Sequence, residues 1–114
     1  MLIDHKCEWM SAVSYKTLPK IGYIAMIGTQ PVAAGFLRRV EGGYAQLDTF
    51  VTNPWFGSQV RHEGIELVVD ALLGEAKELN LLGIIAITKD SGILSRAKER
   101  GFVVVEQSII SKSL

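Results

Sequence analysis

The segment from Gln59 to Glu66, Gln-Val-Arg-His-Glu-Gly-Ile-Glu, places a glycine beside basic side chains at the expected start of a long helix. Backbone N–H groups at a helix N-terminus lack partners within the helix and bind anions, and a glycine there lets a pyrophosphate approach the backbone. Arg61 and His62 would add charge or hydrogen bonds. The pattern therefore predicts a phosphate site, although an ordinary surface helix with exposed Arg61 and His62 gives the same pattern.

Three other groups of residues offer weaker possibilities. Asp90 and Ser91 follow the end of an expected strand, where such sheets bind ligands, but capping of the next helix already accounts for them. Cys7 is a candidate nucleophile only if His5 serves as its base. One cysteine and two histidines cannot supply a closed Cys/His zinc site without carboxylates, so we expect no metal centre.

The first elements that must position these residues are three strands. Apolar runs at 22–27 and 31–40 are separated by residues that include Gly28 and Pro31, and a third run at 44–51 follows Gly42-Gly43. This spacing predicts an antiparallel meander. Strict alternation along the third strand puts Ala45, Leu47, Thr49 and Val51 on one face, and Gln46, Asp48 and Phe50 on the other.

The pattern changes after a loop at 52–58, in which the exposure of Trp55 and Phe56 stays open. Apolar residues then recur at helical spacing over about 60–79. The apolar run at 84–88 predicts a strand buried on both faces, and a short helix ended by Gly101 leads to a last strand at 102–105. The order is β-β-β-α-β-α-β, which predicts one α/β domain of the α+β type over 1–114 with a mixed sheet: an antiparallel meander whose last strand leads into a β-α-β-α-β unit.

Composition limits the possible functions. The chain of 114 residues has 12 basic and 12 acidic residues, a net charge of zero that argues against nucleic acid as its main partner. Hydrophobic residues make up 48% and charged residues 21%, which is typical of a globular protein. No apolar run reaches the ~18 residues of a membrane span, and one cysteine fits a reducing compartment. We therefore predict a cytoplasmic protein without a membrane or nucleic-acid partner.

From about Ile21 to Phe102 the sequence resembles the GNAT superfamily of N-acetyltransferases. The resemblance lies in the long helix and in five short segments, which are Pro-Val-Ala-Ala-Gly-Phe, Asp48-Thr49-Phe50-Val51, Asn53-Pro54, Ile-Ile-Ala-Ile-Thr and Ala97-Lys98-Glu99-Arg100-Gly101-Phe102. The short form and the loop sequence Val51-Thr52-Asn53-Pro54 look most like small acetyltransferase-like proteins of tailed bacteriophages.

This resemblance implies acetyl-CoA as co-substrate and an amine, on a small molecule or a protein, as acceptor. In the family a helix start of the form Q/R-x-x-G-x-G/A holds the pyrophosphate, and Arg61 and Gly64 match it. Backbone groups at Phe50 and Val51 would hold the pantetheine arm, in a gap where the 84–88 strand diverges from the third strand. Asp48 is the candidate general base, with a solvent-facing aspartate as the alternative. The implied cofactor-binding residues are Phe50, Val51, Gln59, Arg61, His62, Gly64, Ile65 and Ser91.

Three departures from the family pattern lead to a second hypothesis. Glu66 replaces the final small residue of the helix motif, Ala97 stands where the family carries a tyrosine that protonates the leaving thiolate, and residues 1–20 leave little room for the two helices that usually shape the acceptor pocket. The alternative is a GNAT-fold binding or assembly module that has lost the coenzyme. Apolar residues in the short N-terminal segment, Leu2, Ile3, Trp9 and Met10, predict a homodimer.

Overall fold

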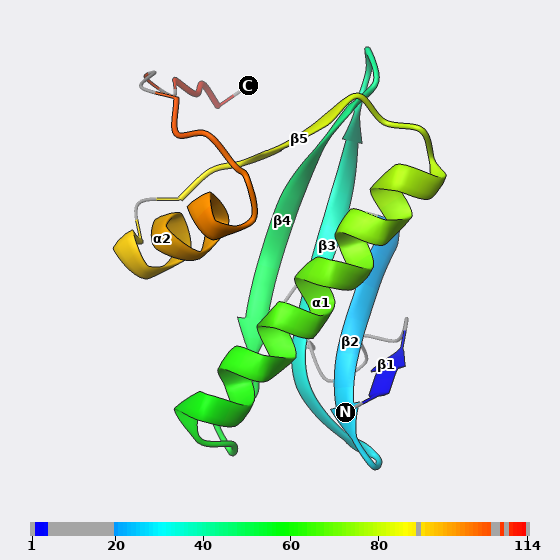
Figure 1. Cartoon of the computed structure of the whole chain (residues 1–114), viewed down its shortest axis with the longest axis vertical. Helices are drawn as coiled ribbons and strands as arrows, with labels where there is room; N and C mark the ends of the chain where they lie inside the picture. Colours follow the sequence, from blue (N-terminus) through cyan, green and yellow to red (C-terminus); the bar gives the residue numbers. More distant parts are fainter. Residues whose placement is uncertain (1, 5–19, 89, 106–107, 109, 114) are drawn as a thin grey trace.

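A computed structural model describes residues 2–4, 20–88, 90–105, 108 and 110–113. This part of the chain forms one five-stranded sheet in the order β1-β2-β3-β4-β5, with two helices (Figure 1). The strands are β1 (Leu2–Asp4), β2 (Ile21–Ile27), β3 (Gln30–Val40), β4 (Tyr44–Thr52) and β5 (Gly83–Ala86), and the helices are α1 (Ser58–Glu78) and α2 (Ser91–Glu99). Strands β1 to β4 are antiparallel and β5 is parallel to β4. The expected mixed sheet is confirmed.

The meander forms where the sequence places its turn residues. Only Gly28 and Thr29 separate β2 from β3, and Gly28 has a φ of 58°. The turn between β3 and β4 contains Gly42 and Gly43, with φ of 95° and 87°. Glycine adopts this left-handed region without steric cost, so these turns close tightly and the strands on either side pair antiparallel.

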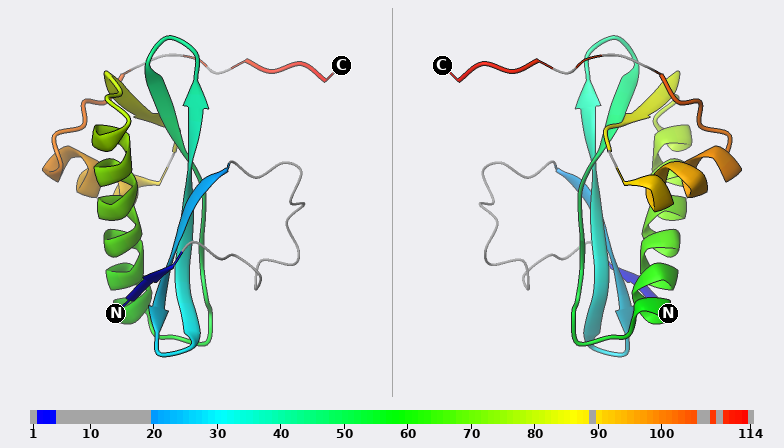
Figure 2. Two further views of the ribbon diagram at one scale, coloured as in Figure 1. Left: turned by 90° about the vertical axis from the view of Figure 1, so that its right-hand side faces the viewer. Right: turned by 90° about the vertical axis from the view of Figure 1, so that its left-hand side faces the viewer.

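Helix α1 covers one face of the sheet (Figure 2). It buries Val68, Leu72 and Ala76, as the helical spacing predicts, against apolar side chains of β2, β3 and β4. The Tyr23 hydroxyl on β2 donates a hydrogen bond of 2.9 Å to Glu75 on α1. Burial, together with this bond to a carboxylate, raises the pKa of Tyr23 above its ordinary value. Among the described helices, none is long and apolar enough to cross a membrane.

Gly64 lies where α1 approaches β3 most tightly. A Cβ atom at this position would stand 2.8 Å from Cγ1 of Val32 and 3.1 Å from Cβ of Ala33. Such distances are shorter than van der Waals contact, so the helix can pack this closely only because residue 64 has no side chain. Gly64 therefore has a packing role that does not depend on any ligand.

Two expectations for the C-terminal half are wrong. Residues 102–105 form no strand, and Val103 is 84% exposed. The predicted strand at 84–88 is shorter and is not buried on both faces, since Ile85 and Ile87 are 46% and 55% exposed. Both errors have one cause: β5 pairs with β4 on one side and with no described strand on the other.

The structure describes only part of the N-terminal segment. Residues 2–4 form β1 and pair with β2, with Leu2 opposite Met26. His5, Cys7, Trp9 and Met10 lie outside the described residues.

Two alanine substitutions in α1 test the packing role of Gly64. We expect Gly64→Ala to lower the free energy of unfolding by about 1–2 kcal/mol, because overpacking costs more than the ~1 kcal/mol that alanine gains over glycine in a helix. Gly74→Ala is the matched control, since a Cβ atom there meets nothing within 4 Å, and should stabilise by about 1 kcal/mol. Urea unfolding measures both. Equal stabilisation by the two substitutions would contradict the tight packing at Gly64.

Candidate functional site

The gap between β4 and β5 is the main candidate site. The two strands pair only from Tyr44 opposite Gly83 to Leu47 opposite Ala86, and β4 then continues without β5 (Figure 1). The expected divergence is therefore confirmed. A cavity of about 470 Å³ lies here, between β4, α1 and α2, and its lining includes Asp48, Thr49, Phe50, Ile87, Ala97 and Phe102.

A β-bulge in β4 borders the cavity. Ala34 pairs with Val51 and Phe36 with Asp48, so two residues of β4, Thr49 and Phe50, stand opposite one residue of β3. Thr49 has a φ of 51°, which is strained for a β-branched residue. Strained backbone of this kind is concentrated at functional sites.

The bulge also corrects the expected faces of β4. Ala45 is part of the core beneath α1, as expected. Val51 instead packs with a second apolar cluster, formed by Ile24, Ala34 and Phe36. The prediction that Val51 shares the face of Ala45 is wrong, because one extra residue shifts the alternation by one position. Of the two residues expected at the pantetheine arm, the side chain of Phe50 lines the cavity and that of Val51 packs in the second cluster.

The aromatic ring of Phe50 lies against Gly35. A Cβ atom on Gly35 would come within 2.4 Å of the ring. The same arrangement recurs where Phe36 covers Gly22 and Tyr44 covers Gly83. Glycine in a strand thus gives an aromatic ring from the neighbouring strand a place to pack, and Gly35 fixes the ring of Phe50 at the wall of the cavity.

The start of α1 differs from the expectation in one respect. The helix begins at Ser58, and the N–H of Arg61 already bonds to the carbonyl oxygen of Gly57 at 3.1 Å. The N–H groups without a partner in the helix are therefore those of residues 58–60, one turn before Gly64. Gln59 belongs to this first turn, and its amide donates to Glu63 at 3.2 Å. No side chain caps this helix end.

The loop that leads into α1 is held by Asn53. Its side-chain amide donates to the carbonyl of Pro31 at 2.8 Å, and its backbone N–H donates to the carbonyl of Val32 at 2.7 Å. Its side-chain oxygen accepts a bond of 3.0 Å from the N–H of Trp55. Trp55 is 92% exposed, whereas Phe56 packs against the core. Asn53 therefore fixes the path from the bulged strand to the helix start.

Arg61, the expected pyrophosphate ligand, lies in the first turns of α1 with its side chain partly buried. Its Nε atom is buried and has no hydrogen-bond partner in the described part of the chain. A buried N–H of this kind is costly to leave unpaired, and an oxygen atom of an anion is one group that could satisfy it.

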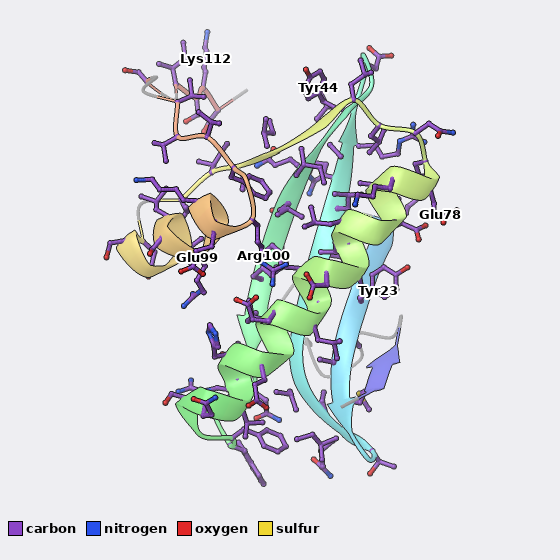
Figure 3. The ribbon with its side chains drawn as sticks, viewed as in Figure 1. Tyr23, Tyr44, Glu78, Glu99, Arg100 and Lys112 are labelled. Carbon is purple, nitrogen blue, oxygen red and sulfur yellow. The ribbon has the colours of Figure 1, made fainter. Side chains whose placement is uncertain are left out.

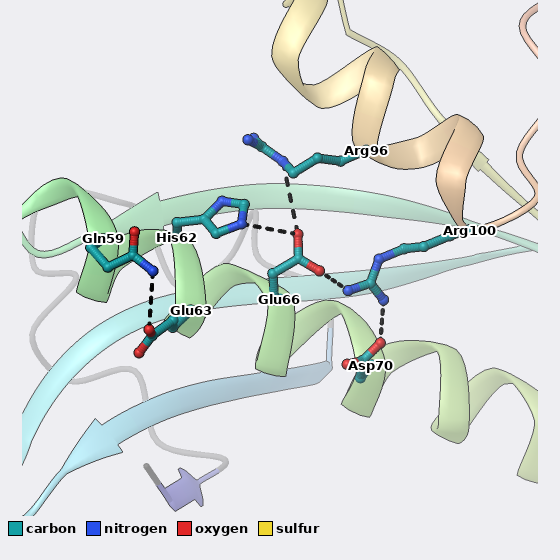
Figure 4. Close-up of polar contacts among 7 residues, drawn as sticks. All are labelled: Gln59, His62, Glu63, Glu66, Asp70, Arg96 and Arg100. Carbon is teal, nitrogen blue, oxygen red and sulfur yellow. Dashed lines mark hydrogen bonds and ion pairs between the residues drawn. The ribbon is translucent and has the colours of Figure 1, made fainter.

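Glu66 joins α1 to α2 through ion pairs (Figure 4). Arg100 reaches from the end of α2 toward α1 (Figure 3). One of its guanidinium nitrogens donates a hydrogen bond to Glu66, and the other donates one to Asp70. Arg96 Nε and His62 Nε2 lie 3.9 Å and 3.8 Å from Oε1 of Glu66. The carboxylate that replaces the small residue of the family pattern is therefore surrounded by basic groups.

This cluster was not predicted from the sequence, although the spacing of its residues carries a signal for it. Glu66 and Asp70 are spaced i, i+4 on α1, and Arg96 and Arg100 are spaced i, i+4 on α2. Residues at this spacing share one helix face. One face of α1 therefore carries two acidic side chains, and one face of α2 carries two basic side chains. Matching the two faces would have predicted the contact.

Asp48, the candidate base, is held in an ion pair. Arg38 Nε donates to one carboxylate oxygen at 2.7 Å, and the hydroxyl of Thr49 donates to the other at 3.1 Å. Partial burial pushes the pKa of Asp48 upward, but the hydrogen bonds from Arg38 and Thr49 and the charge of Arg38 outweigh burial and hold the pKa below its ordinary value. Asp48 is therefore ionised at neutral pH and is a weak base.

Helix α2 forms the far side of the cavity and buries none of its own residues. Asp90 is its cap, since its carboxylate accepts a 3.0 Å bond from the N–H of Ile93, and Ser91 is the exposed first helical residue. At the other end, Gly101 has a φ of 87° and Phe102 donates to the carbonyl of Ala97, as expected for a glycine-terminated helix. In the described residues no group of three or more His, Cys, Asp or Glu side chains is placed to hold a metal.

No protein-family model and no curated protein matches the sequence. The fold, however, is similar to solved structures. Rv2747 from Mycobacterium tuberculosis, in complex with CoA and NLQ, matches with a TM-score of 0.61 and 21% identity over 81% of this chain and 54% of that one, so this chain spans about half its length.

Two further structures support the same fold. The aminoglycoside N-acetyltransferase AAC(6')-Iy, in complex with CoA, has a TM-score of 0.64 and 13% identity over 82% of this chain and 75% of that one. A mutant of TTHA1254 from Thermus thermophilus has a TM-score of 0.72 and 12% identity over 100% of this chain and 98% of that one. At these identities the similarity establishes the fold.

The ion pair between Arg38 and Asp48 predicts a change in titration. We expect Arg38→Gln to raise the pKa of Asp48, because burial remains while the stabilising charge is lost. In the unsubstituted protein the lowered pKa contributes stability above the ordinary pKa of about 4, and this is lost as the pH falls through the lowered value. An NMR titration of the Asp48 carboxyl measures the shift.

The neighbouring Arg39 is exposed and provides the control. Arg39→Gln removes the same charge from β3 and should leave the Asp48 pKa nearly unchanged. Identical Asp48 titrations in the Arg38→Gln variant and the unsubstituted protein would contradict the assigned ion pair.

Proposed function

We propose that this chain, which has the fold of the GNAT N-acetyltransferases, binds acetyl-CoA between β4 and β5 and transfers the acetyl group to an amine. The observation that carries the proposal is the early end of β4–β5 pairing, beside a strained bulge at Thr49 and an open cavity of about 470 Å³. A thioester on a slender arm fits such a gap, because unpaired strand edges can bond to its amide groups.

The donor end of the site would use the start of α1. The N–H groups of residues 58–60 are free of helical partners and would bind the pyrophosphate, with Gln59 and Arg61 beside them. The unpartnered Nε of Arg61 supports this assignment. His62, Gly64 and Ile65 lie in the following turn, and Ser91 begins the helix on the other side of the cavity. The pantetheine arm would run along the backbone at Phe50 and Val51.

The chemistry would be direct attack. The amine nitrogen forms a bond to the thioester carbonyl carbon while a backbone N–H near the bulge stabilises the oxyanion, and the carbon–sulfur bond then breaks. The amine proton goes to water or to Asp48. Because Ala97 has no proton to give, the leaving thiolate takes its proton from water. With so weak a base and no proton donor at position 97, the rate would depend on proximity and orientation.

The acceptor would be an amine on a small molecule or a protein. Asp48 lies in the lining of the cavity and is held ionised by Arg38. An ionised carboxylate attracts an ammonium group before the proton is lost, which favours a cationic amine as acceptor.

A second function is favoured by two observations. Glu66, Arg96 and Arg100 line the α1–α2 side of the cavity, and Ala97 has no proton to give to a leaving thiolate. A GNAT-fold binding module that has lost the coenzyme would carry such changes at no cost.

Calorimetry with acetyl-CoA separates the two functions. We expect binding to the unsubstituted protein, and we expect Arg61→Ala to weaken it by about 1.5–3 kcal/mol, the usual contribution of a charge-assisted hydrogen bond. Arg39→Ala, which removes an exposed arginine of β3, should leave binding nearly unchanged. If the unsubstituted protein gives no heat and acetyl-CoA does not raise its melting temperature, the donor site does not exist and the binding module is correct.

We also propose a homodimer. In addition to the apolar N-terminal residues noted in the sequence, β5 exposes Ile85 and the segment after α2 exposes Val103 and Val105, and a second copy would cover these side chains. Light scattering at micromolar concentration should give twice the mass of one chain. A monomeric mass would contradict the proposal.

A further inference from the structure

The carboxylate of Glu66 faces three basic side chains from two helices (Figure 4). Arg100 donates a hydrogen bond to Oε2, and Arg96 Nε and His62 Nε2 face Oε1 from 3.9 Å and 3.8 Å. This is the environment that an enzyme or binding protein gives to a bound anion. Here the anion is a side chain of the protein itself.

Two of the three basic side chains, Arg96 and His62, do not form a hydrogen bond with Glu66. The distances from Arg96 and His62 to Glu66 are too long for hydrogen bonds, and among the residues drawn in Figure 4 neither side chain contacts any partner other than Glu66. Their side chains are 39% and 42% exposed. Their N–H groups are therefore accessible to a larger anion than a carboxylate.

Three residues of the cluster border the candidate site, and His62 lies beside them on α1. Glu66, Arg96 and Arg100 all line the cavity between β4 and β5, whose other walls are largely apolar, with Leu47 and Ile65 among them. Glu66 and Asp70 balance the charges of Arg96 and Arg100. If the carboxylate of Glu66 moved aside, Arg96 would have no acidic partner among the described residues, and the cavity would become positively charged at this end.

We propose that Arg96, Arg100 and His62 form a phosphate subsite, and that Glu66 occupies it as an internal substitute in the free protein. A phosphate group of the coenzyme would replace the Glu66 carboxylate and accept hydrogen bonds from both guanidinium groups. The proposed subsite depends on the proposed function in one respect, which is that the coenzyme supplies the phosphate group. Glu66 is then a competitor that lowers anion affinity.

The test uses inorganic pyrophosphate and acetyl-CoA as separate probes in calorimetry at low salt. We expect Glu66→Gln, which keeps the size of the side chain, to bind pyrophosphate about five- to ten-fold more tightly than the unsubstituted protein. Arg96→Gln should bind it about five-fold more weakly. Glu78→Gln removes the same charge at the other end of α1 (Figure 3) and should change affinity by less than two-fold.

Each outcome decides the proposal. Equal or weaker pyrophosphate binding by Glu66→Gln overturns it, and weaker binding would mean that the carboxylate serves only to hold α2 in place. Absence of pyrophosphate binding in all variants also overturns it. Tighter pyrophosphate binding by Glu66→Gln without any acetyl-CoA binding supports the subsite and contradicts the proposed function. Acetyl-CoA binding that is insensitive to Glu66→Gln and Arg96→Gln supports the proposed function and contradicts the subsite.

Discussion

The extra residue in β4 is the constraint on which the arrangement of the site depends. Pairing with β5 ends at Leu47, immediately before the bulge at Thr49 and Phe50. A strained backbone such as that of Thr49 costs of order 1–3 kcal/mol, and it persists because pairing with β3 resumes on both sides of it, at Asp48 and at Val51. The same bulge places the Phe50 ring so that it packs against Gly35. Three features follow from this one inserted residue: the divergence of β5 from β4, the position of the Phe50 ring in the cavity wall, and the change of face at Val51.

The two helices are held by different forces. Helix α1 buries Val68, Leu72 and Ala76 and cannot leave the sheet without exposing the core. Helix α2 buries no residue, and its polar contacts with α1 among the described residues are the ion pairs of Arg96 and Arg100. Exposed ion pairs contribute little stability and are screened by salt. Of the two helical walls of the cavity, α1 is therefore held by core packing and α2 by ion pairs.

Local rules made much of the fold predictable, and tertiary contacts decided the rest. The turn at Gly42-Gly43, the cap at Asp90 and the helical spacing after residue 60 are local signals, and each was confirmed. The bulge was not predictable, because the sequence 44–51 alternates without a visible interruption. The apolar run at 84–88 suggested a central strand, but its place at the edge depends on whether another strand pairs with it. Gly64 fits a phosphate site and a helix contact equally well in sequence, and only the distance to Val32 identified its packing role.

The departure at Glu66 has a different meaning in the structure than in the sequence. A lone carboxylate near a pyrophosphate would repel it, which is why the residue favoured a protein without coenzyme. The structure gives that carboxylate two arginines and a histidine as neighbours, so the group is neutralised where it stands. His62 lies one helical turn before Glu66, and Arg96 faces it from α2, both at distances too long for a hydrogen bond. The proposed subsite would use the N–H groups of both side chains to bind an anion larger than a carboxylate. Under the proposed function, Ala97 is the more serious departure, because an alanine side chain has no proton to give to the leaving thiolate.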